Sequence, residues 1–163
     1  MRQYFLIKVS NHNREAFLIW YCNSKEGVLL NKKRLLMFES VNEAMLFAEK
    51  KGKTLDGEVA EYNLSAITGL VDRVSRTESC NELLNVWNLF SDIANSLGEE
   101  FSGDSDEELT RDIYNMLFHG CNILSDIYGE FHPIFDEEEK ERCLSVLSDG
   151  LAMLDKQFDS YFT

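Results

Sequence analysis

Apolar and polar residues alternate in the first third of the chain. Residues 3–10 and 16–22 are rich in β-branched and aromatic side chains, and the turn-type cluster Asn11-His12-Asn13-Arg14 separates them. This pattern predicts a β-hairpin. The short apolar runs 28–30 and 35–38 flank a basic stretch and are expected to extend the sheet by one or two strands.

A helix and a further strand are predicted to complete this part. Ser40 and Glu43 form a capping box, apolar residues then recur at helical spacing, and Gly52 follows a basic last turn, so we expect a helix over about 41–51. Residues 58–64 alternate with a period of two, which predicts a half-buried strand that closes the sheet.

From Ser65 onward the apolar spacing becomes helical. A short helix is expected around Ile67–Val74, and three long helices follow. Each long helix is predicted to begin with a capping pair, namely Ser79 with Glu82, Ser105 with Glu108, and Asp136 with Glu139. The first is expected to stop at Gly98 and the second at Gly129. Gly120 lies inside the second helix and is expected to mark a close helix crossing.

This order of strands followed by helices is typical of an α+β protein. We expect an N-terminal antiparallel β-sheet of about four strands with one helix, packed on a C-terminal bundle of three longer helices. The 163 residues are enough for one domain, with a β-rich part at 1–64 and an acidic helical part at 65–163. The apolar fraction of 44% and the single proline favour a globular chain.

Targeting signals and paired cysteines are missing. No apolar run reaches the roughly 18 residues of a membrane span, and Lys8 interrupts the first apolar stretch before it could serve as a signal peptide. We therefore expect a cytoplasmic protein. Cys22, Cys80, Cys121 and Cys143 show no paired spacing, which predicts four free thiols and no zinc site.

Motifs that carry catalytic chemistry are also missing. His12, His119 and His132 have no metal-ligand spacing, and the segment between Gly98 and Gly103 carries two glutamates that would repel a nucleotide. His119 and Cys121 are two residues apart on a predicted helix and would point in different directions. The sequence predicts no catalytic residue, no cofactor and no metal, so we expect a protein that is not an enzyme.

Charge is distributed unevenly. Residues 1–77 contain 12 Lys and Arg against 9 Asp and Glu, a net of +3, whereas residues 78–163 contain 4 against 20, a net of −16. Such an acidic half repels phosphate backbones and anionic lipids, which disfavours direct nucleic-acid or membrane binding. The expected partner is a basic protein, although acidity that serves only solubility remains the alternative.

Two acidic clusters precede predicted helices and are the candidate partner-binding site. The helix macrodipole accounts for part of this placement, and no calcium loop is expected because Leu109 replaces its required glycine. The aromatic residues Phe101, Tyr128, Phe131 and Phe135 are candidates for a desolvated centre. The predicted partner-binding residues are Glu99, Glu100, Phe101, Asp104, Asp106, Glu107, Glu108, Asp136, Glu137, Glu138 and Glu141.

In this layout the chain resembles the immunity proteins of bacterial contact-dependent growth inhibition and related polymorphic toxin systems. The shared features are a β-rich N-terminal half, an acidic helical C-terminal half and the absence of an active-site motif. The resemblance implies a specific inhibitor of a basic toxin domain, often a nuclease, whose active-site cleft it covers with an acidic surface. We expect a monomer or weak dimer.

Two other function classes stay open. A nucleic-acid mimic that inhibits a DNA- or RNA-binding protein would spread its carboxylates over one elongated face. A small enzyme or regulator would instead present a concave pocket lined by His12 or His132 with a converging carboxylate.

Overall fold

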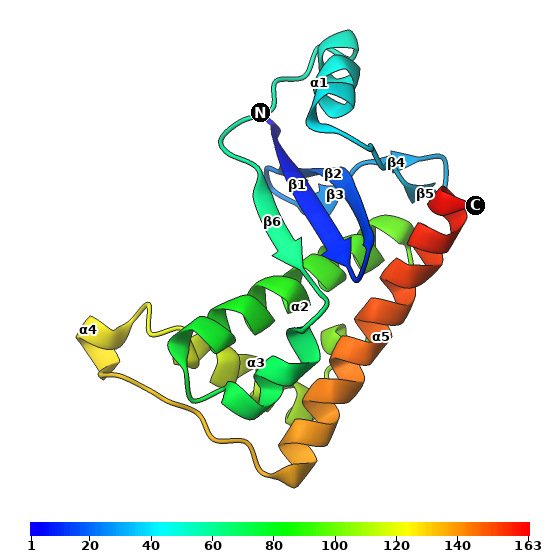
Figure 1. Ribbon diagram of the computed structural model, residues 1–163. Helices are drawn as coiled ribbons and strands as arrows, with labels where there is room; N and C mark the ends of the chain where they lie inside the picture. Colours follow the sequence, from blue (N-terminus) through cyan, green and yellow to red (C-terminus); the bar gives the residue numbers. More distant parts are fainter. The chain divides into compact units, whose positions relative to one another are not determined.

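A computed structural model describes residues 1–163 of the protein (Figure 1). All of its strands precede the long helices in sequence. The fold is α+β, as predicted. The elements are β1 (Gln3–Asn11), β2 (Arg14–Cys22), β3 (Glu26–Val28), β4 (Leu30–Asn31), β5 (Arg34–Leu35), α1 (Val41–Lys50), β6 (Ala60–Asn63), η1 (Ile67–Arg73), α2 (Thr77–Leu97), η2 (Ser102–Asp104), α3 (Glu108–Gly120), α4 (Ser125–Tyr128) and α5 (Glu137–Phe162).

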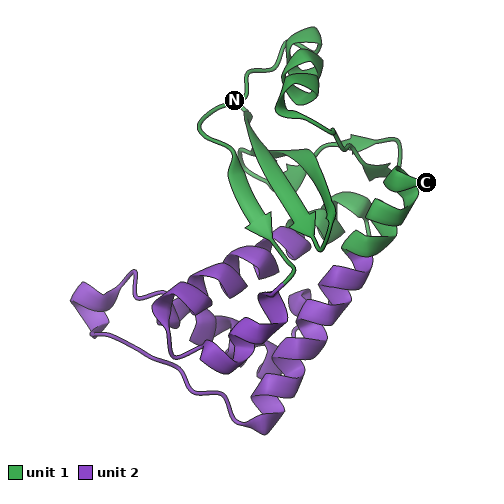
Figure 2. Ribbon diagram, viewed as in Figure 1, with its two compact units in different colours: residues 1–65, 92–99, 154–163 green, residues 66–91, 100–153 purple.

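The chain divides into two compact units that alternate along the sequence (Figure 2). Unit 1 contains residues 1–65, 92–99 and 154–163, and unit 2 contains residues 66–91 and 100–153. The first boundary agrees with the change in pattern seen at Ser65. The ends of α2 and α5 belong to unit 1, so these two helices contribute residues to both units.

The sheet of unit 1 has the strand order β3-β2-β1-β6. β1 and β2 form the predicted antiparallel hairpin, in register from Gln3 opposite Cys22 to Asn11 opposite Arg14. The prediction of a purely antiparallel sheet is wrong for β6, which runs parallel to β1. A parallel neighbour requires a crossover connection, and here the chain between β2 and β6 includes α1.

Both short runs after the hairpin pair with β2, the first through the strand β3 and the second through a single antiparallel bridge between Phe38 and Phe17. β3 pairs with β2, whereas β4 and β5 pair with each other in a separate two-stranded sheet. The predicted helix is confirmed as α1: the Ser40 hydroxyl accepts a hydrogen bond from the Glu43 N–H at 3.2 Å, and Gly52 follows the helix with a φ of 68°.

Distant segments of the chain complete unit 1 through side-chain hydrogen bonds. From residues 92–99, Asp92 accepts a bond from Trp20 Nε1 at 2.8 Å, and the Ser96 hydroxyl accepts one from the Val28 N–H at 3.0 Å. From residues 154–163, Gln157 is buried and accepts from the Leu35 N–H at 3.0 Å. The sheet therefore depends on residues that lie far away in sequence.

Arg14 adds ion pairs at the end of the hairpin. It pairs with Asp159 at 2.6 Å and with Asp155 at 3.4 Å. Asp155 also accepts a hydrogen bond from the buried Asn11 at 3.1 Å. The hairpin turn is thus fixed to residues 154–163.

Unit 2 is built from η1, η2, α3, α4 and the larger parts of α2 and α5, and two glycines allow its helices to approach closely. A Cβ at Gly150 of α5 would lie 2.0 Å from a ring carbon of Phe90, and one at Gly120 of α3 would lie 2.4 Å from the Cys80 sulfur. The predicted close approach at Gly120 is confirmed. The largest fully buried side chains of unit 2 include Trp87, Phe90, Ile113, Leu117 and Leu147.

The helix starts in unit 2 follow the predicted caps in one case of three. Asp136 and Glu139 form the reciprocal capping box of α5, with hydrogen bonds of 2.9 and 2.8 Å. α2 begins at Thr77, so Ser79 lies inside the helix and is buried. α3 begins at Glu108, and the Ser105 hydroxyl accepts from the Glu107 N–H at 3.1 Å in the turn before it.

The second predicted helix is wrong beyond Gly120. α3 ends there, and Asn122 adopts a left-handed backbone with a φ of 56°, which asparagine tolerates better than most residues. The short helix α4 follows, and residues 129–136 connect it to α5. The apolar residues assigned to the end of one long helix therefore lie in α4 and in the turn before it.

Candidate docking site in unit 2

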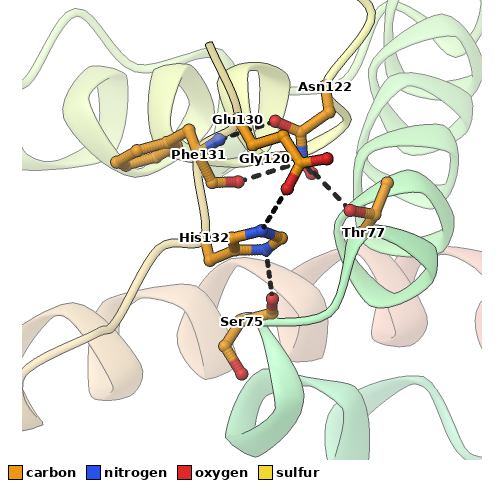
Figure 3. Close-up of polar contacts among 7 residues, drawn as sticks. All are labelled: Ser75, Thr77, Gly120, Asn122, Glu130, Phe131 and His132. Carbon is orange, nitrogen blue, oxygen red and sulfur yellow. Dashed lines mark hydrogen bonds and ion pairs between the residues drawn. The ribbon is translucent and has the colours of Figure 1, made fainter. Parts of the chain in front are cut away.

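The loop between α3 and α5 carries α4 away from the other helices of unit 2 (Figure 2). Its first residue after the α3 cap is Asn122, and it returns to the unit through His132 and the buried residues Pro133 and Phe135. The two ends of the loop are fixed by the polar contacts drawn in Figure 3.

Asn122 closes the loop with its side-chain amide. Its Oδ1 accepts from the Phe131 N–H at 2.7 Å, and its Nδ2 lies 3.0 Å from the Phe131 carbonyl oxygen (Figure 3). The same Nδ2 lies 3.0 Å from Thr77 Oγ1 at the start of α2 and 3.1 Å from the Gly120 carbonyl oxygen. One side chain therefore joins both ends of the loop and holds them against α2.

His132 fixes the returning end of the loop. Its Nδ1 lies 2.9 Å from the Ser75 carbonyl oxygen, so Nδ1 carries the hydrogen, because a carbonyl oxygen only accepts. Its Nε2 lies 3.3 Å from Glu130 Oε2. The hydrogen bond to Glu130 and that to Ser75 raise the pKa of His132. Both ring nitrogens are occupied, so neither is free to act on a substrate in this arrangement.

A pocket of about 820 Å³ lies between this loop and α3. On the α3 side it is lined by Asp112, Asn115, Met116 and His119, which share one face because helical residues three, four and seven apart align. The opposite stripe of α3, with Ile113 and Leu117, is buried in unit 2. The helix thus packs one face and presents the other to the pocket.

Large apolar side chains are exposed in and beside the loop, and four of them, Phe118, Leu124, Tyr128 and Phe131, line the pocket. Tyr128 is 75% exposed, Ile127 73% and Ile134 81%, although residues of these types are usually buried. Of the 13 large hydrophobic residues exposed in the whole protein, seven fall between residues 118 and 134. They are Phe118, Ile123, Leu124, Ile127, Tyr128, Phe131 and Ile134.

The charged residues that line the pocket are all acidic. They are Asp112, Glu130 and Glu139, and no Lys or Arg lines it. Glu130 faces His132, and Glu139 accepts a hydrogen bond from the Asp136 N–H, whereas Asp112 makes no hydrogen bond or ion pair. The pocket thus combines an apolar lining with three carboxylates, of which Glu130 contacts His132 and Asp112 makes no ion pair.

The predicted aromatic residues divide into two groups. Phe101 is buried and its ring contacts Phe90 at 5.9 Å between centroids, and Phe135 is buried as well. Neither presents a side chain to a partner, so we leave Phe101 out of the docking site. Tyr128 and Phe131 line the pocket.

The first predicted acidic cluster lies on the surface but outside this pocket. Glu99, Glu100, Asp106 and Glu108 are exposed. Asp104 accepts a hydrogen bond from the Ser91 hydroxyl at 2.6 Å, and Glu107 pairs with Arg142 at 2.5 Å. Asp104 and Asp106 line a second, smaller pocket of about 340 Å³ together with Arg111.

The second predicted cluster begins α5. Asp136 caps that helix, and Glu137 pairs with Lys140 at 3.8 Å. Glu138 and Glu141 are exposed and make no ion pair. None of the predicted partner-binding residues lines the large pocket, but Glu139, their neighbour in sequence, does.

Sequence reasoning named Tyr128 and Phe131 but missed the exposure of Ile123, Leu124 and Ile127, because these three residues continue the apolar spacing of α3. The available signal was the combination of Gly120, Asn122 and Pro133, three residues that end helices or favour turns.

None of the four cysteine thiols lines the pocket. All four cysteines are free, and Cys80, Cys121 and Cys143 are buried in unit 2. Burial raises the pKa of Cys80 to about 11 and that of Cys143 to about 12, and it also raises the pKa of Cys121. A thiol with such a pKa is protonated near neutral pH and is a weak nucleophile.

Comparison with known proteins gives no relative. No protein-family model, no curated protein and no solved structure matches the chain. None of the helices has both the length and the apolar character that crossing a membrane requires. No three His, Cys, Asp or Glu side chains are arranged to hold a metal ion.

Proposed function

We propose that the protein is an immunity protein that binds and neutralises a basic toxin domain, of which a nuclease is the expected class, in the cytoplasm. The observation that carries this proposal is the charge of unit 2. Its residues include 5 Lys and Arg against 17 Asp and Glu, a net of −12, whereas unit 1 has 11 against 12, a net of −1.

Electrostatics supports a basic partner. A nuclease lines its cleft with Lys and Arg to hold phosphate, so a surface rich in carboxylates is attracted to that cleft over a distance and associates quickly. Glu100, Asp106, Glu108, Glu138 and Glu141 are exposed carboxylates of unit 2 without an ion pair, and they are suited to this role. Fast association suits an inhibitor whose target is lethal.

The exposed apolar residues favour a protein inhibitor over a mimic of nucleic acid. Long residence requires a desolvated contact, which aromatic and aliphatic side chains such as Tyr128 and Ile127 provide. A phosphate backbone has no counterpart to such side chains. The proposal therefore assigns association to the carboxylates and retention to the loop, and it requires no catalysis by this chain.

Growth rescue tests the proposal. Proteins cross-linked to this one in its native cells would be identified, and each basic partner would be expressed alone and together with this protein. We expect one partner to arrest growth alone and co-expression to restore growth. A partner that is harmless, or toxicity that co-expression leaves unchanged, would contradict the proposal.

A matched pair of variants separates function from mere acidity. Glu100→Gln, Asp106→Asn and Glu108→Gln remove three charges from unit 2, whereas Glu26→Gln, Glu49→Gln and Glu58→Gln remove three exposed charges from unit 1. The first set should slow association with the partner by roughly tenfold or more at low salt, and the second set should change it little. Equal effects would mean that the acidity acts only through total charge.

A further inference from the structure

We infer that the pocket between α3 and the loop 122–131 receives a segment of the partner that carries an arginine beside a bulky apolar residue. The inference rests on the proposed function, because it takes the partner to be basic, and it adds the place and the chemistry of the central contact. The predicted acidic clusters lie outside this pocket, so the inference concerns different residues.

The apolar half of the recognition comes from exposed rings and aliphatic chains. Phe118, Leu124 and Tyr128 line the pocket and are each more than one-third exposed. Their exposure costs free energy that is recovered when an apolar side chain covers them. When most large apolar side chains of a protein are buried, a concentrated patch of exposed ones is typical of an interaction site.

The cationic half of the recognition comes from the carboxylates. Asp112 has no partner, and Glu130 and Glu139 are both acceptors at the same pocket. No Lys or Arg lines the pocket, so its Asp and Glu side chains face no permanent positive charge within the lining. Hydrogen bonds between a cation and a carboxylate are about twice as strong as neutral ones, and they strengthen further when water is displaced.

Arginine suits this lining better than lysine. The rings of Phe118, His119 and Phe131 are grouped here, with centroid distances of 5.6 Å between Phe118 and His119 and 6.5 Å between His119 and Phe131. A guanidinium plane stacks on such rings and bonds a carboxylate with two parallel N–H groups, whereas an ammonium does neither as well.

The loop is held in place before a partner arrives. Asn122 joins both ends of the loop to α2, and His132 fixes the returning end to the Ser75 carbonyl group (Figure 3). Contact surfaces that are fixed in advance lose less conformational entropy on binding. The pocket therefore has the lining, the charge and the rigidity of a specific site.

Another apolar surface of the protein provides a control. The pocket of about 580 Å³ beside α1 is lined by Met45 and Leu46, which are exposed, but it contains Lys53 as well as Glu49. Its two charges have opposite signs, so it lacks the preference for a cation. It lies in unit 1, outside the acidic part of the protein.

Selection from randomised short peptides tests the inference without knowledge of the partner. The full chain would be immobilised, and enriched peptides would be synthesised and titrated in solution. We expect enrichment of arginine next to Trp, Phe or Leu. Asp112→Asn and Tyr128→Ala should each weaken binding by about tenfold or more, whereas Met45→Ala and Glu49→Gln should leave it unchanged.

Folding and specificity are controlled by conservative variants. Asp112 and Tyr128 are exposed, so both variants should keep the circular dichroism of the parent protein, and Tyr128→Phe should retain most of the binding. Enrichment without arginine, no enrichment, or equal losses from the control variants would each overturn the inference.

The outcomes also separate this inference from the proposed function. Basic peptides that are insensitive to Asp112→Asn and Tyr128→Ala but sensitive to loss of Glu100, Asp106 and Glu108 would overturn the pocket and leave the basic partner supported. Arginine-bearing peptides that bind in the pocket, combined with failed growth rescue, would support the pocket and contradict the immunity function.

Discussion

The two units of the protein use their charged residues differently. In unit 1 two basic residues form ion pairs within the unit: Arg14 bonds Asp155 and Asp159, and Lys8 contacts Glu15 at 3.2 Å and Glu61 at 4.0 Å. Unit 2 contains only 5 Lys and Arg but 17 Asp and Glu, so most of its carboxylates cannot pair with a Lys or Arg of the same unit. The charges of unit 1 are nearly balanced in number, whereas unit 2 has a large excess of carboxylates.

The units also differ in where they expose apolar side chains. In unit 1 the exposed large hydrophobic residues Met1, Met45, Leu46, Val59 and Phe162 are scattered over the N-terminus, α1, the segment before β6 and the end of α5. In unit 2 all but Leu144 fall between residues 118 and 134. Scattered exposure is ordinary, whereas a concentrated exposed apolar patch is typical of an interaction site.

The largest expected effect tests whether the units unfold separately. Trp87 is fully buried in unit 2, and Trp87→Ala should cost about 3–5 kcal/mol of stability. Because α2 and α5 contribute residues to both units and helices form cooperatively, we expect β1 and β2 of unit 1 to lose hydrogen-exchange protection as well.

The control for this experiment is Ile19→Ala, which creates a cavity in the sheet of unit 1. It should reduce protection in α3 of unit 2 in the same way. If either variant leaves the other unit fully protected, the two units are independent domains and the prediction of one domain over residues 1–163 is wrong.

A smaller effect is expected at the base of the loop. Asn122→Ala removes the hydrogen bonds to Phe131 and Thr77 and places alanine at a φ of 56°, so opening of the loop should become easier by about 2 kcal/mol. Amide exchange over residues 123–131 measures it. Asn122→Gly tolerates the backbone conformation, and the difference between the two variants isolates the backbone contribution.

Alkaline pH should destabilise the protein through two buried thiols of unit 2. The raised pKa values of Cys80 and Cys143 mean that the folded state holds protons that the unfolded state releases above about pH 9. Stability is therefore full below pH 9 and falls as the pH rises towards 11 and 12, by about 1 kcal/mol per thiol at pH 10.

Denaturant titrations of the parent protein and of Cys80→Ala with Cys143→Ala between pH 8 and 10 would check this loss. Unchanged stability of the parent across that range would contradict it. The double variant should lose less stability over the same interval, whatever its stability at neutral pH.

The smallest expected effect concerns His132. Its raised pKa depends first on Glu130, so Glu130→Gln should lower that pKa, which NMR titration of the ring measures. The charged form of His132 is favoured in the folded loop. The contact with Glu130 therefore stabilises the fold fully below the ordinary histidine pKa of 6.5, and this stabilisation is lost as the pH rises through the raised pKa. An unchanged pKa in Glu130→Gln would show that Ser75 alone causes the shift.

The sequence predicted the fold correctly where a short motif determines the local structure. The hairpin turn at 11–14, the cap at Ser40 and the capping box of Asp136 with Glu139 were all readable, because short-range hydrogen bonds determine them. The parallel pairing of β6 with β1 could not be predicted in this way. It depends on the side of the sheet to which the connection through α1 returns the chain.

The candidate site was predicted only in part, for a related reason. The acidity of unit 2 is visible in composition, and Tyr128 and Phe131 were named. The pocket depends on the end of α3 at Gly120 and on the contacts of Asn122 with Thr77 and Phe131, which lie 45 and 9 residues away in sequence. Helical spacing continues through this break, so periodicity alone could not reveal it.

The interleaving of the units has a consequence for biosynthesis. The hairpin made first needs residues 154–163, because Arg14, Asn11 and the Leu35 N–H find their partners there. A ribosome adding about 5–20 residues per second needs on the order of 5–20 s to proceed from residue 65 to residue 154. During that interval Arg14, Asn11 and the Leu35 N–H lack their partners in α5. The hairpin that is translated first therefore acquires its last contacts only when the end of α5 has been made.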